Sequence, residues 1–201
     1  MLSQSNKSAF RVAHHDFDIL ESVPGIETYP ARNAEIAALA TLARATVPGV
    51  TLSDDDLAAY CRINPNTAFT FARNGQLLGG IAFLYLNDDG LDALILDTID
   101  LRRPQLRLLA QPDEVPAAIY WWALAAKGRG IGGLGGIARL FASPQYRTVD
   151  FYTQPSSEDG RRIVSALGFE RMPSWQTDLR TYRRAANREA ARSEAHLLQA
   201  A

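Results

Sequence analysis

Apolar residues recur along this 201-residue chain at two different spacings, which predict helices in some segments and strands in others. Residues 30–45 place isoleucine and leucine three positions apart among alanines, as an amphipathic helix requires. Ser53 is followed by three aspartates and predicts the N-terminus of a second helix, which continues to about Arg62. Two apolar, aromatic runs then flank an Asn-Gly turn signal, so residues 68–86 are predicted to form a β-hairpin.

The second half of the chain shows strand and helix patterns in alternation. Residues 115–126 are almost entirely apolar and predict a central strand that is buried on both faces. Residues 91–99 fit either a short helix or a strand. The remaining predictions, in chain order, are a turn at 87–90, an irregular connection at 101–111, a glycine-rich turn and helix to 141, a strand at 148–153, a helix at 156–167 ending at Gly168, and closing strands at 169–172 and 177–183.

These elements predict one mixed α/β domain over residues 9–184, since no repeat or flexible linker divides the chain. Residues 1–8 form a polar, flexible N-terminus in this interpretation, and residues 185–201 form a helical tail. Four arginines in and just before this tail are expected to lie in solvent or, alternatively, to contact a partner; they are Arg183, Arg184, Arg188 and Arg192. Trp121 and Trp122 are expected on opposite faces of the central strand.

Composition excludes several classes of protein. Apolar residues make up 47% and charged residues 21%, which is typical of a folded globular chain. A formal net charge of −1 argues against a general nucleic-acid binder. Neither an apolar leader nor an apolar stretch of roughly 18 residues occurs, so we expect a cytoplasmic protein without a membrane anchor. Cys61 is the single cysteine and is expected to be a buried thiol, and His14 and His15 have no metal-ligand partners at suitable spacing, so no metal site is expected.

The most informative segment follows the central strand. Six of the chain's 14 glycines lie between Gly128 and Gly136, preceded by Lys127 and interrupted by Arg129. A strand that runs into a basic, glycine-rich turn and then a helix is suited to bind an anion, because backbone N–H groups and the helix dipole both favour negative charge. The segment therefore predicts a site for a phosphate-bearing molecule.

Residues 115–183 resemble the GCN5-related N-acetyltransferase (GNAT) superfamily. The resemblance rests on the strand into Lys127-Gly128-Arg129-Gly130-Ile131-Gly132, the following strand and helix, and the pair Gly168-Phe169. In that family the turn reads (Gln/Arg)-x-x-Gly-x-(Gly/Ala), and its amides bind the pyrophosphate of acetyl-CoA. The resemblance implies a GNAT-like fold and transfer of an acyl group from acetyl-CoA, or another acyl-CoA, to a small-molecule or protein amine. A homodimer stays open.

The resemblance also assigns residues to the cofactor. The residues assigned to CoA are Ala125, Ala126, Lys127, Gly128, Arg129, Gly130, Ile131, Gly132, Gly133 and Ser157. Ala125 and Ala126 would offer backbone groups to the pantetheine arm, and Ser157 stands where the family often has asparagine. Lysine stands where the family has glutamine or arginine; it keeps the positive charge but lacks a planar fork.

The catalytic residues are less defined. Many family members have a tyrosine that protonates the leaving thiolate, but here that position is Val164, with Ser165 beside it. Ser165 is therefore the candidate at the acid position. Glu114 is the candidate general base, and the further carboxylates considered for that role are Asp113, Asp97 and Asp100.

Two other functions remain open at this stage. The absence of the tyrosine is compatible with a GNAT-like protein that binds CoA or an acyl group without turnover. Gly128, Gly130 and Gly133 also fit Gly-x-Gly-x-x-Gly, and Asp150 follows Gly128 by 22 positions, which is typical of a dinucleotide-binding oxidoreductase. Arg161 and Arg162 are expected either in solvent or beside the 3′-phosphate of CoA.

Overall fold

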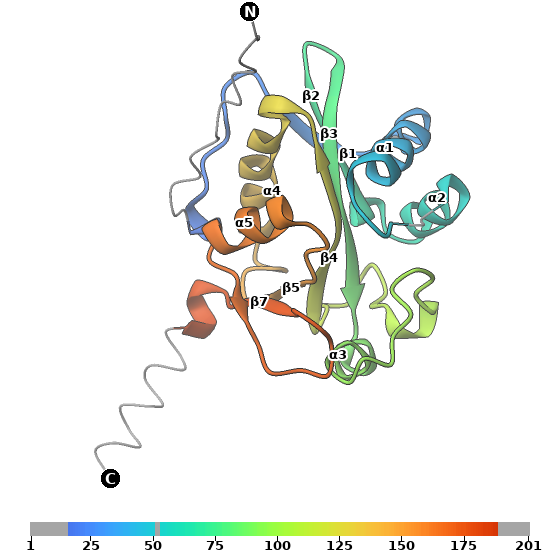
Figure 1. Cartoon of the computed structure of the whole chain (residues 1–201), viewed down its shortest axis with the longest axis vertical. Helices are drawn as coiled ribbons and strands as arrows, with labels where there is room; N and C mark the ends of the chain where they lie inside the picture. Colours follow the sequence, from blue (N-terminus) through green and yellow to red (C-terminus); the bar gives the residue numbers. More distant parts are fainter. Residues whose placement is uncertain (1–15, 51–52, 189–201) are drawn as a thin grey trace, which may run out of the picture.

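A computed structural model describes residues 16–50 and 53–188, and these residues build a seven-stranded mixed sheet with helices on both faces (Figure 1). The strands are β1 (Glu27–Pro30), β2 (Ala68–Arg73), β3 (Gln76–Leu86), β4 (Ala118–Ala126), β5 (Phe151–Thr153), β6 (Glu170–Arg171) and β7 (Arg180–Tyr182). The α-helices are α1 (Asn33–Thr46), α2 (Asp54–Ile63), α3 (Asp88–Ile95), α4 (Leu134–Phe141) and α5 (Glu158–Ala166). Short 3₁₀ helices are η1 (Phe17–Ile19), η2 (Pro65–Thr67), η3 (Leu106–Leu108) and η4 (Gly128–Gly133).

The strands follow the order β1-β2-β3-β4-β5-β7-β6 across the sheet. β4 and β5 run parallel, and every other neighbouring pair is antiparallel. A dinucleotide-binding fold of the doubly wound type needs a mostly parallel sheet. The topology therefore contradicts the dinucleotide alternative, although the glycine spacing fitted it.

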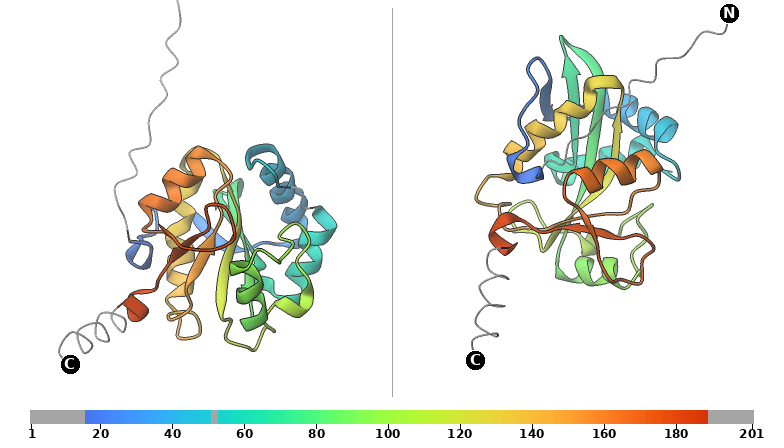
Figure 2. Two further views of the ribbon diagram at one scale, coloured as in Figure 1. Left: turned by 60° about the horizontal axis from the view of Figure 1, so that its bottom comes forward. Right: turned by 60° about the vertical axis from the view of Figure 1, so that its left-hand side comes forward.

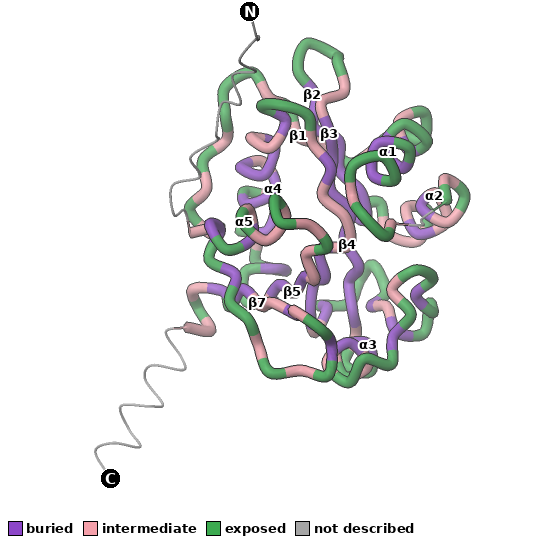
Figure 3. Tube along the Cα trace, in the orientation of Figure 1, coloured by how far each residue is buried: buried purple, intermediate pink, exposed green. Residues whose placement is uncertain are grey.

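Helices cover the sheet in two layers. α4 and α5 lie on one face, and α1, α2 and α3 lie on the other (Figure 2). Buried residues concentrate along β3 and β4, which run through the middle of the molecule (Figure 3). Trp121 belongs to an aromatic core beneath α4, whereas Trp122 faces the opposite layer, where its indole N–H donates to the Leu101 carbonyl at 2.6 Å. The expected separation of the two tryptophans is confirmed.

Local signals placed most elements correctly. Ser53 caps α2 by accepting a hydrogen bond from the Asp56 N–H at 3.0 Å, and Ser157 caps α5 in the same way. Gly168 ends α5 with a left-handed backbone at φ +91°. The hairpin lies where it was predicted, and the central strand ends where it was predicted but begins at Ala118, because Val115 is exposed in the preceding loop.

Two elements differ from the prediction. Residues 87–90 are the N-cap and first turn of α3 and not a free turn, because the Asn87 side chain accepts from the Gly90 N–H at 2.9 Å. Asparagine favours both turns and helix N-caps, so its presence alone did not distinguish them. The ambiguous segment after it is helical as far as Ile95. β1 was not predicted at all, because this short edge strand is only half-buried and has no apolar alternation.

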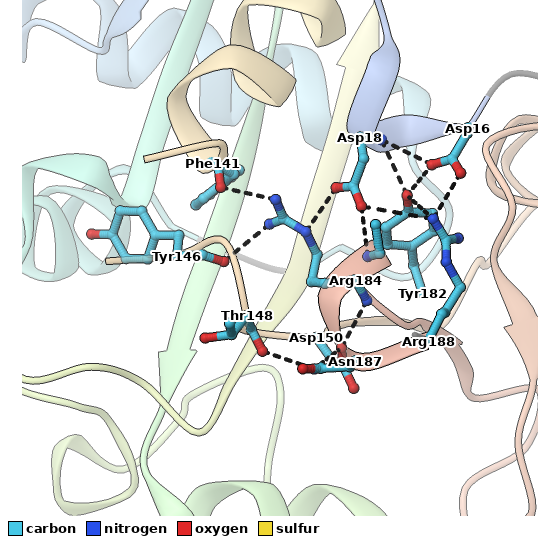
Figure 4. Close-up of polar contacts among 11 residues, drawn as sticks. Asp16, Asp18, Phe141, Tyr146, Thr148, Asp150, Tyr182, Arg184, Asn187 and Arg188 are labelled. Carbon is cyan, nitrogen blue, oxygen red and sulfur yellow. Dashed lines mark hydrogen bonds and ion pairs between the residues drawn. The ribbon is translucent and has the colours of Figure 1, made fainter. Parts of the chain in front are cut away.

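The expectation of a solvated tail is wrong for Arg184. Arg184 is 3% exposed, and its guanidinium forms an ion pair with Asp18 at 2.7 Å and donates to the carbonyls of Phe141 and Tyr146 (Figure 4). Arg188 pairs with Asp16 at 2.7 Å. Residues 1–15, including the predicted flexible N-terminus and His14 and His15, lie outside the described residues, as does the tail beyond 188.

Candidate functional site

β4 leaves its parallel neighbour halfway along its length. β5 pairs with β4 only from Ile119 to Trp121, whereas β4 continues to Ala126 and keeps β3 as its partner. At the point of separation the β3–β4 register shifts, so Trp122 has no direct partner on β3. Such a bulge redirects a strand and increases its twist. From Trp122 onward, the edge of β4 that faced β5 has no strand partner in the described part of the chain. We call this unpaired edge the opening, and it ends at the glycine turn.

The glycine turn begins where β4 ends. Lys127 still belongs to the sheet, since its N–H donates to the Leu78 carbonyl of β3 at 2.8 Å. Gly128 then takes a left-handed backbone at φ +53°, with open space where a side chain would be. Gly130 packs directly on β3, because a Cβ atom there would lie 2.9 Å from the Leu78 carbonyl oxygen. The turn is thus anchored at Lys127 and Gly130 and exposed between them.

The exposed part of the turn is cationic. Neither Lys127 nor Arg129 forms an ion pair with a residue in the described part of the chain, although both side chains are accessible. α4 starts immediately after the turn, so the positive end of its dipole adjoins the turn. Two uncompensated cations beside glycine backbone fit a phosphate group, and the residues predicted for this site are therefore together.

The later glycines of the run have a different role. A Cβ at Gly133 would lie 2.2 Å from the Phe71 ring, and one at Gly135 would lie 2.1 Å from the Glu21 carbonyl oxygen. Gly136 packs equally closely on Thr28. At these three positions, around the start of α4, glycine is therefore required by close packing against neighbouring segments of the protein and not by a ligand.

The remaining predicted cofactor residues lie along the opening or near it. Ala125 and Ala126 pair with Gly80 and Gly79 of β3, and the missing side chain of Gly79 lets β3 approach the Ala125 carbonyl closely. Ser157 uses its hydroxyl oxygen to cap α5, where it accepts from the Gly160 N–H at 3.0 Å. Arg161 and Arg162 pair with Glu158 on the exposed face of α5.

The acid position contains an unexpected polar pair. Val164 is 4% exposed and packs in the core, whereas Ser165 is exposed and accepts a hydrogen bond from the Arg180 guanidinium. The Arg180 side chain is only 12% exposed and pairs with Asp178 at 3.2 Å. Arg180 lies opposite Thr153, the last β5 residue that pairs with β4, and therefore stands beside the opening. Sequence reasoning missed Arg180, because only strand pairing brings it to Ser165.

Two tyrosines also stand at the opening. Tyr120 of β4 and Tyr152 of β5 are register partners just before the strands separate. Burial raises the pKa of Tyr120 well above its ordinary value and raises the pKa of Tyr152 as well, so both phenols stay protonated at neutral pH. They are candidate hydrogen-bond donors that the apolar pattern of these strands concealed.

The structure does not bring Glu114 to the turn. Glu114 is exposed in the loop before β4 and accepts a hydrogen bond from the Gln111 N–H at 2.8 Å. The whole length of β4, about 30 Å at strand spacing, separates it from Lys127. Asp113 lies in the same loop, and Asp100 accepts from the Arg102 N–H within its own turn. The sequence shows that Glu114 lies close to β4 along the chain, but it does not show that the glycine turn lies at the other end of that strand.

Other chemistries find little support among the described residues. Within residues 16–50 and 53–188 no group of three or more histidine, cysteine, aspartate or glutamate side chains could hold a metal ion. Burial raises the pKa of the Cys61 thiol to about 11, which disfavours a nucleophilic thiolate. No helix in the described part is long and apolar enough to cross a bilayer. Asp150 accepts from the Arg184 N–H and the Asn187 amide, so its carboxylate serves the fold.

Comparison with known proteins gives the class of fold. No family model and no curated protein matches the sequence. Among solved structures, a GNAT family acetyltransferase from Streptococcus agalactiae is similar with a TM-score of 0.50 and 15% identity, over 79% of this chain and 93% of that one. The loading GNATL domain of CurA from Lyngbya majuscula has the same TM-score and identity, over 79% of this chain and 97% of that one. The chain therefore has a GNAT fold, as its sequence predicted.

Proposed function

We propose that this chain is an acyl-CoA-dependent N-acyltransferase that transfers an acyl group, acetyl in the simplest case, to an amine. One observation carries the proposal: the pairing of β4 with β5 ends after Trp121, and β4 runs on to an exposed turn whose two cations have no ion-pair partner among residues 16–50 and 53–188. An opening between parallel strands suits a narrow, extended ligand arm, and the turn at its end suits the pyrophosphate. The GNAT fold supports the same assignment.

Each part of the site has a proposed role. The backbone of residues 128–133 binds the pyrophosphate, and Lys127 and Arg129 add charge. Backbone groups of Ala125 and Ala126 hold the pantetheine arm along the open edge of β4. The amine attacks the thioester carbonyl directly, and a main-chain N–H of β4 stabilises the oxyanion. The C–S bond breaks as the tetrahedral intermediate collapses to the amide, and the proton lost by the amine passes through water to the leaving thiolate. Ser165, held by Arg180, donates a hydrogen bond toward the leaving sulfur in place of the usual tyrosine.

Turnover tests this proposal. Release of the CoA thiol is followed with acetyl-CoA and a panel of amines that spans small polyamines, amino acids and peptides. We expect amine-dependent release by the wild-type chain and at least a tenfold loss of kcat/KM in the Lys127→Ala/Arg129→Ala double variant. The control removes two exposed arginines elsewhere, Arg107→Ala/Arg147→Ala, and keeps full activity. Equal rates in the two double variants would exclude the turn as the cofactor site.

A second candidate function is binding of CoA or an acyl group without catalysis. The buried Val164 at the acid position favours it, since no ionisable group replaces the tyrosine at that position itself. This version predicts acetyl-CoA binding that depends on Lys127 and Arg129, together with no thiol release for any amine. Measurable turnover with one amine excludes it.

A further inference from the structure

The N-terminal strap, defined as residues 16–30, packs against α4 and the end of the glycine turn. It begins with η1 and ends with β1, which pairs with β2 through four residues. Between these two ends it passes over α4, and Figure 2 shows the two segments side by side. The strap thus lies against α4, the helix that follows the glycine turn.

The strap contacts the last two residues of the turn. The Thr28 hydroxyl donates a hydrogen bond to the Gly133 carbonyl at 2.8 Å. Val23 and Ile26 lie against Gly132, where a Cβ would come within 2.6 Å of Val23 and 3.0 Å of Ile26. Because Gly132 and Gly133 have no side chains, the strap contacts their backbone directly. These contacts therefore restrict the backbone conformation of the turn.

Both ends of the strap are fixed to other parts of the fold. At its start, Asp18 pairs with the buried Arg184, and Asp16 accepts from the Tyr182 hydroxyl (Figure 4). At its end, the β1–β2 ladder holds Thr28 in register with Phe71, and Phe71 in turn packs on Gly133. The strap is therefore a restrained element that can hold the turn.

A turn this rich in glycine needs such a restraint. Glycine loses more backbone entropy on ordering than any other residue, and a ligand that ordered the turn would have to supply that free energy. We propose that the strap preorganises the glycine turn for CoA, and that Thr28 is the positioning residue that transmits this effect through its bond to Gly133. The inference rests on the proposed binding of CoA at the turn.

Calorimetric titration of CoA into the purified full chain tests the inference. Thr28→Val keeps the shape of the side chain and removes the hydroxyl, so Kd is expected to rise roughly fivefold, the equivalent of one net hydrogen bond. Thr28→Ser keeps the hydroxyl and restores the wild-type Kd. Thr70→Val is the matched control, because it removes a hydroxyl that donates to Glu35 on α1, and it leaves Kd unchanged.

The outcomes separate this inference from the proposed function. All variants are titrated at a temperature at which thermal unfolding shows each of them fully folded, so that stability alone cannot change Kd. If the wild-type chain binds CoA and Thr28→Val binds it equally well, the positioning role is wrong and the proposed function stands. If the wild-type chain itself does not bind CoA, both fail together.

Discussion

Glycines 128–136 divide into two groups according to what a side chain would meet. Gly128 has open space around it and a left-handed backbone, which suits direct contact with a ligand. Gly133 and Gly135 lie against Phe71 and the Glu21 carbonyl, so they are required by packing. The glycine-rich composition of this segment thus combines exposed positions, which we propose for ligand binding, with packed positions, and only the structure separates the two.

Gly135→Ala is expected to destabilise the fold. Its Cβ would overlap the strap backbone at Glu21, and overpacking of this kind costs about 1–3 kcal/mol. Urea unfolding followed by circular dichroism measures the change in free energy of unfolding. An unchanged midpoint would show that the strap does not pack on α4 as described.

Arg184 makes the strongest prediction at a single position. Arg184→Met removes the nearer of the two cations beside the Asp18 carboxylate, since Arg188 lies 3.8 Å away, and it leaves the Phe141 and Tyr146 carbonyls without their donor. The loss of this buried network is expected to cost about 3–5 kcal/mol of stability. Arg162→Met, which removes a side chain that is 70% exposed, costs less than about 1 kcal/mol. Denaturant unfolding of both variants provides the comparison, and equal losses would contradict the role of Arg184. Asp18→Asn added to Arg184→Met should recover part of the loss.

At the scale of elements, the contacts of η1 with β7 join the two ends of the described chain. Burial opposes ionisation of Asp16, but hydrogen bonds from Tyr182, the Asp18 N–H and Arg188, together with the charge of Arg188, outweigh it and hold the pKa of Asp16 below its ordinary value. Burial and the bond to Asp16 raise the pKa of Tyr182 well above its ordinary value. Both shifts favour the bonded pair near neutral pH.

The Asp16 shift predicts how stability depends on pH. Because the folded pKa lies below the unfolded value of about 4, this carboxylate stabilises the fold above that pH, and the contribution disappears as pH falls through the folded value. Asp16→Asn should therefore lower Tm at pH 6, and its difference from the wild-type chain should shrink below about pH 4. Thermal melts across pH 3–7 measure this, and a constant difference would contradict the assignment.

Elements defined by local signals could be predicted from the sequence. Ser53, Ser157 and Gly168 act on neighbouring backbone, so short-range patterns were sufficient. β1 could not be predicted, because an edge strand gains its stability from pairing with β2, more than 30 positions away. α3 was hidden by an asparagine that serves turns and helix caps equally.

In the candidate site, too, only the features that depend on neighbouring residues could be predicted from the sequence. Residues 125–133 are contiguous, so the position of the glycine turn could be predicted from the sequence alone, whereas its assignment to CoA stays a prediction. The Ser165–Arg180 bond and the distance of Glu114 both depend on which strands lie side by side, which no local pattern contains. Arg184 looked like a surface residue for the same reason, since its partner Asp18 lies near the other end of the chain.

At the scale of the whole molecule, the candidate site lies where the one parallel strand pair of an otherwise antiparallel sheet ends. The hydrogen-bonded pairing of β5 with β4 ends at Thr153, whereas β4 continues to pair with β3 as far as Ala126, next to the turn. The sheet order excludes a doubly wound nucleotide fold and fits a GNAT fold. The ligand we expect at the glycine turn is therefore CoA and not the dinucleotide that the glycine spacing alone would also fit.

The central claim is that the turn at Lys127–Gly133 binds the pyrophosphate of CoA. Calorimetric titration of acetyl-CoA into the wild-type chain, with NADH titrated in parallel, tests it most directly. The account predicts saturable binding of acetyl-CoA, at least tenfold weaker binding in Lys127→Ala/Arg129→Ala, and no binding of NADH. Absence of acetyl-CoA binding at millimolar concentration, or equal affinity in the double variant, would contradict it.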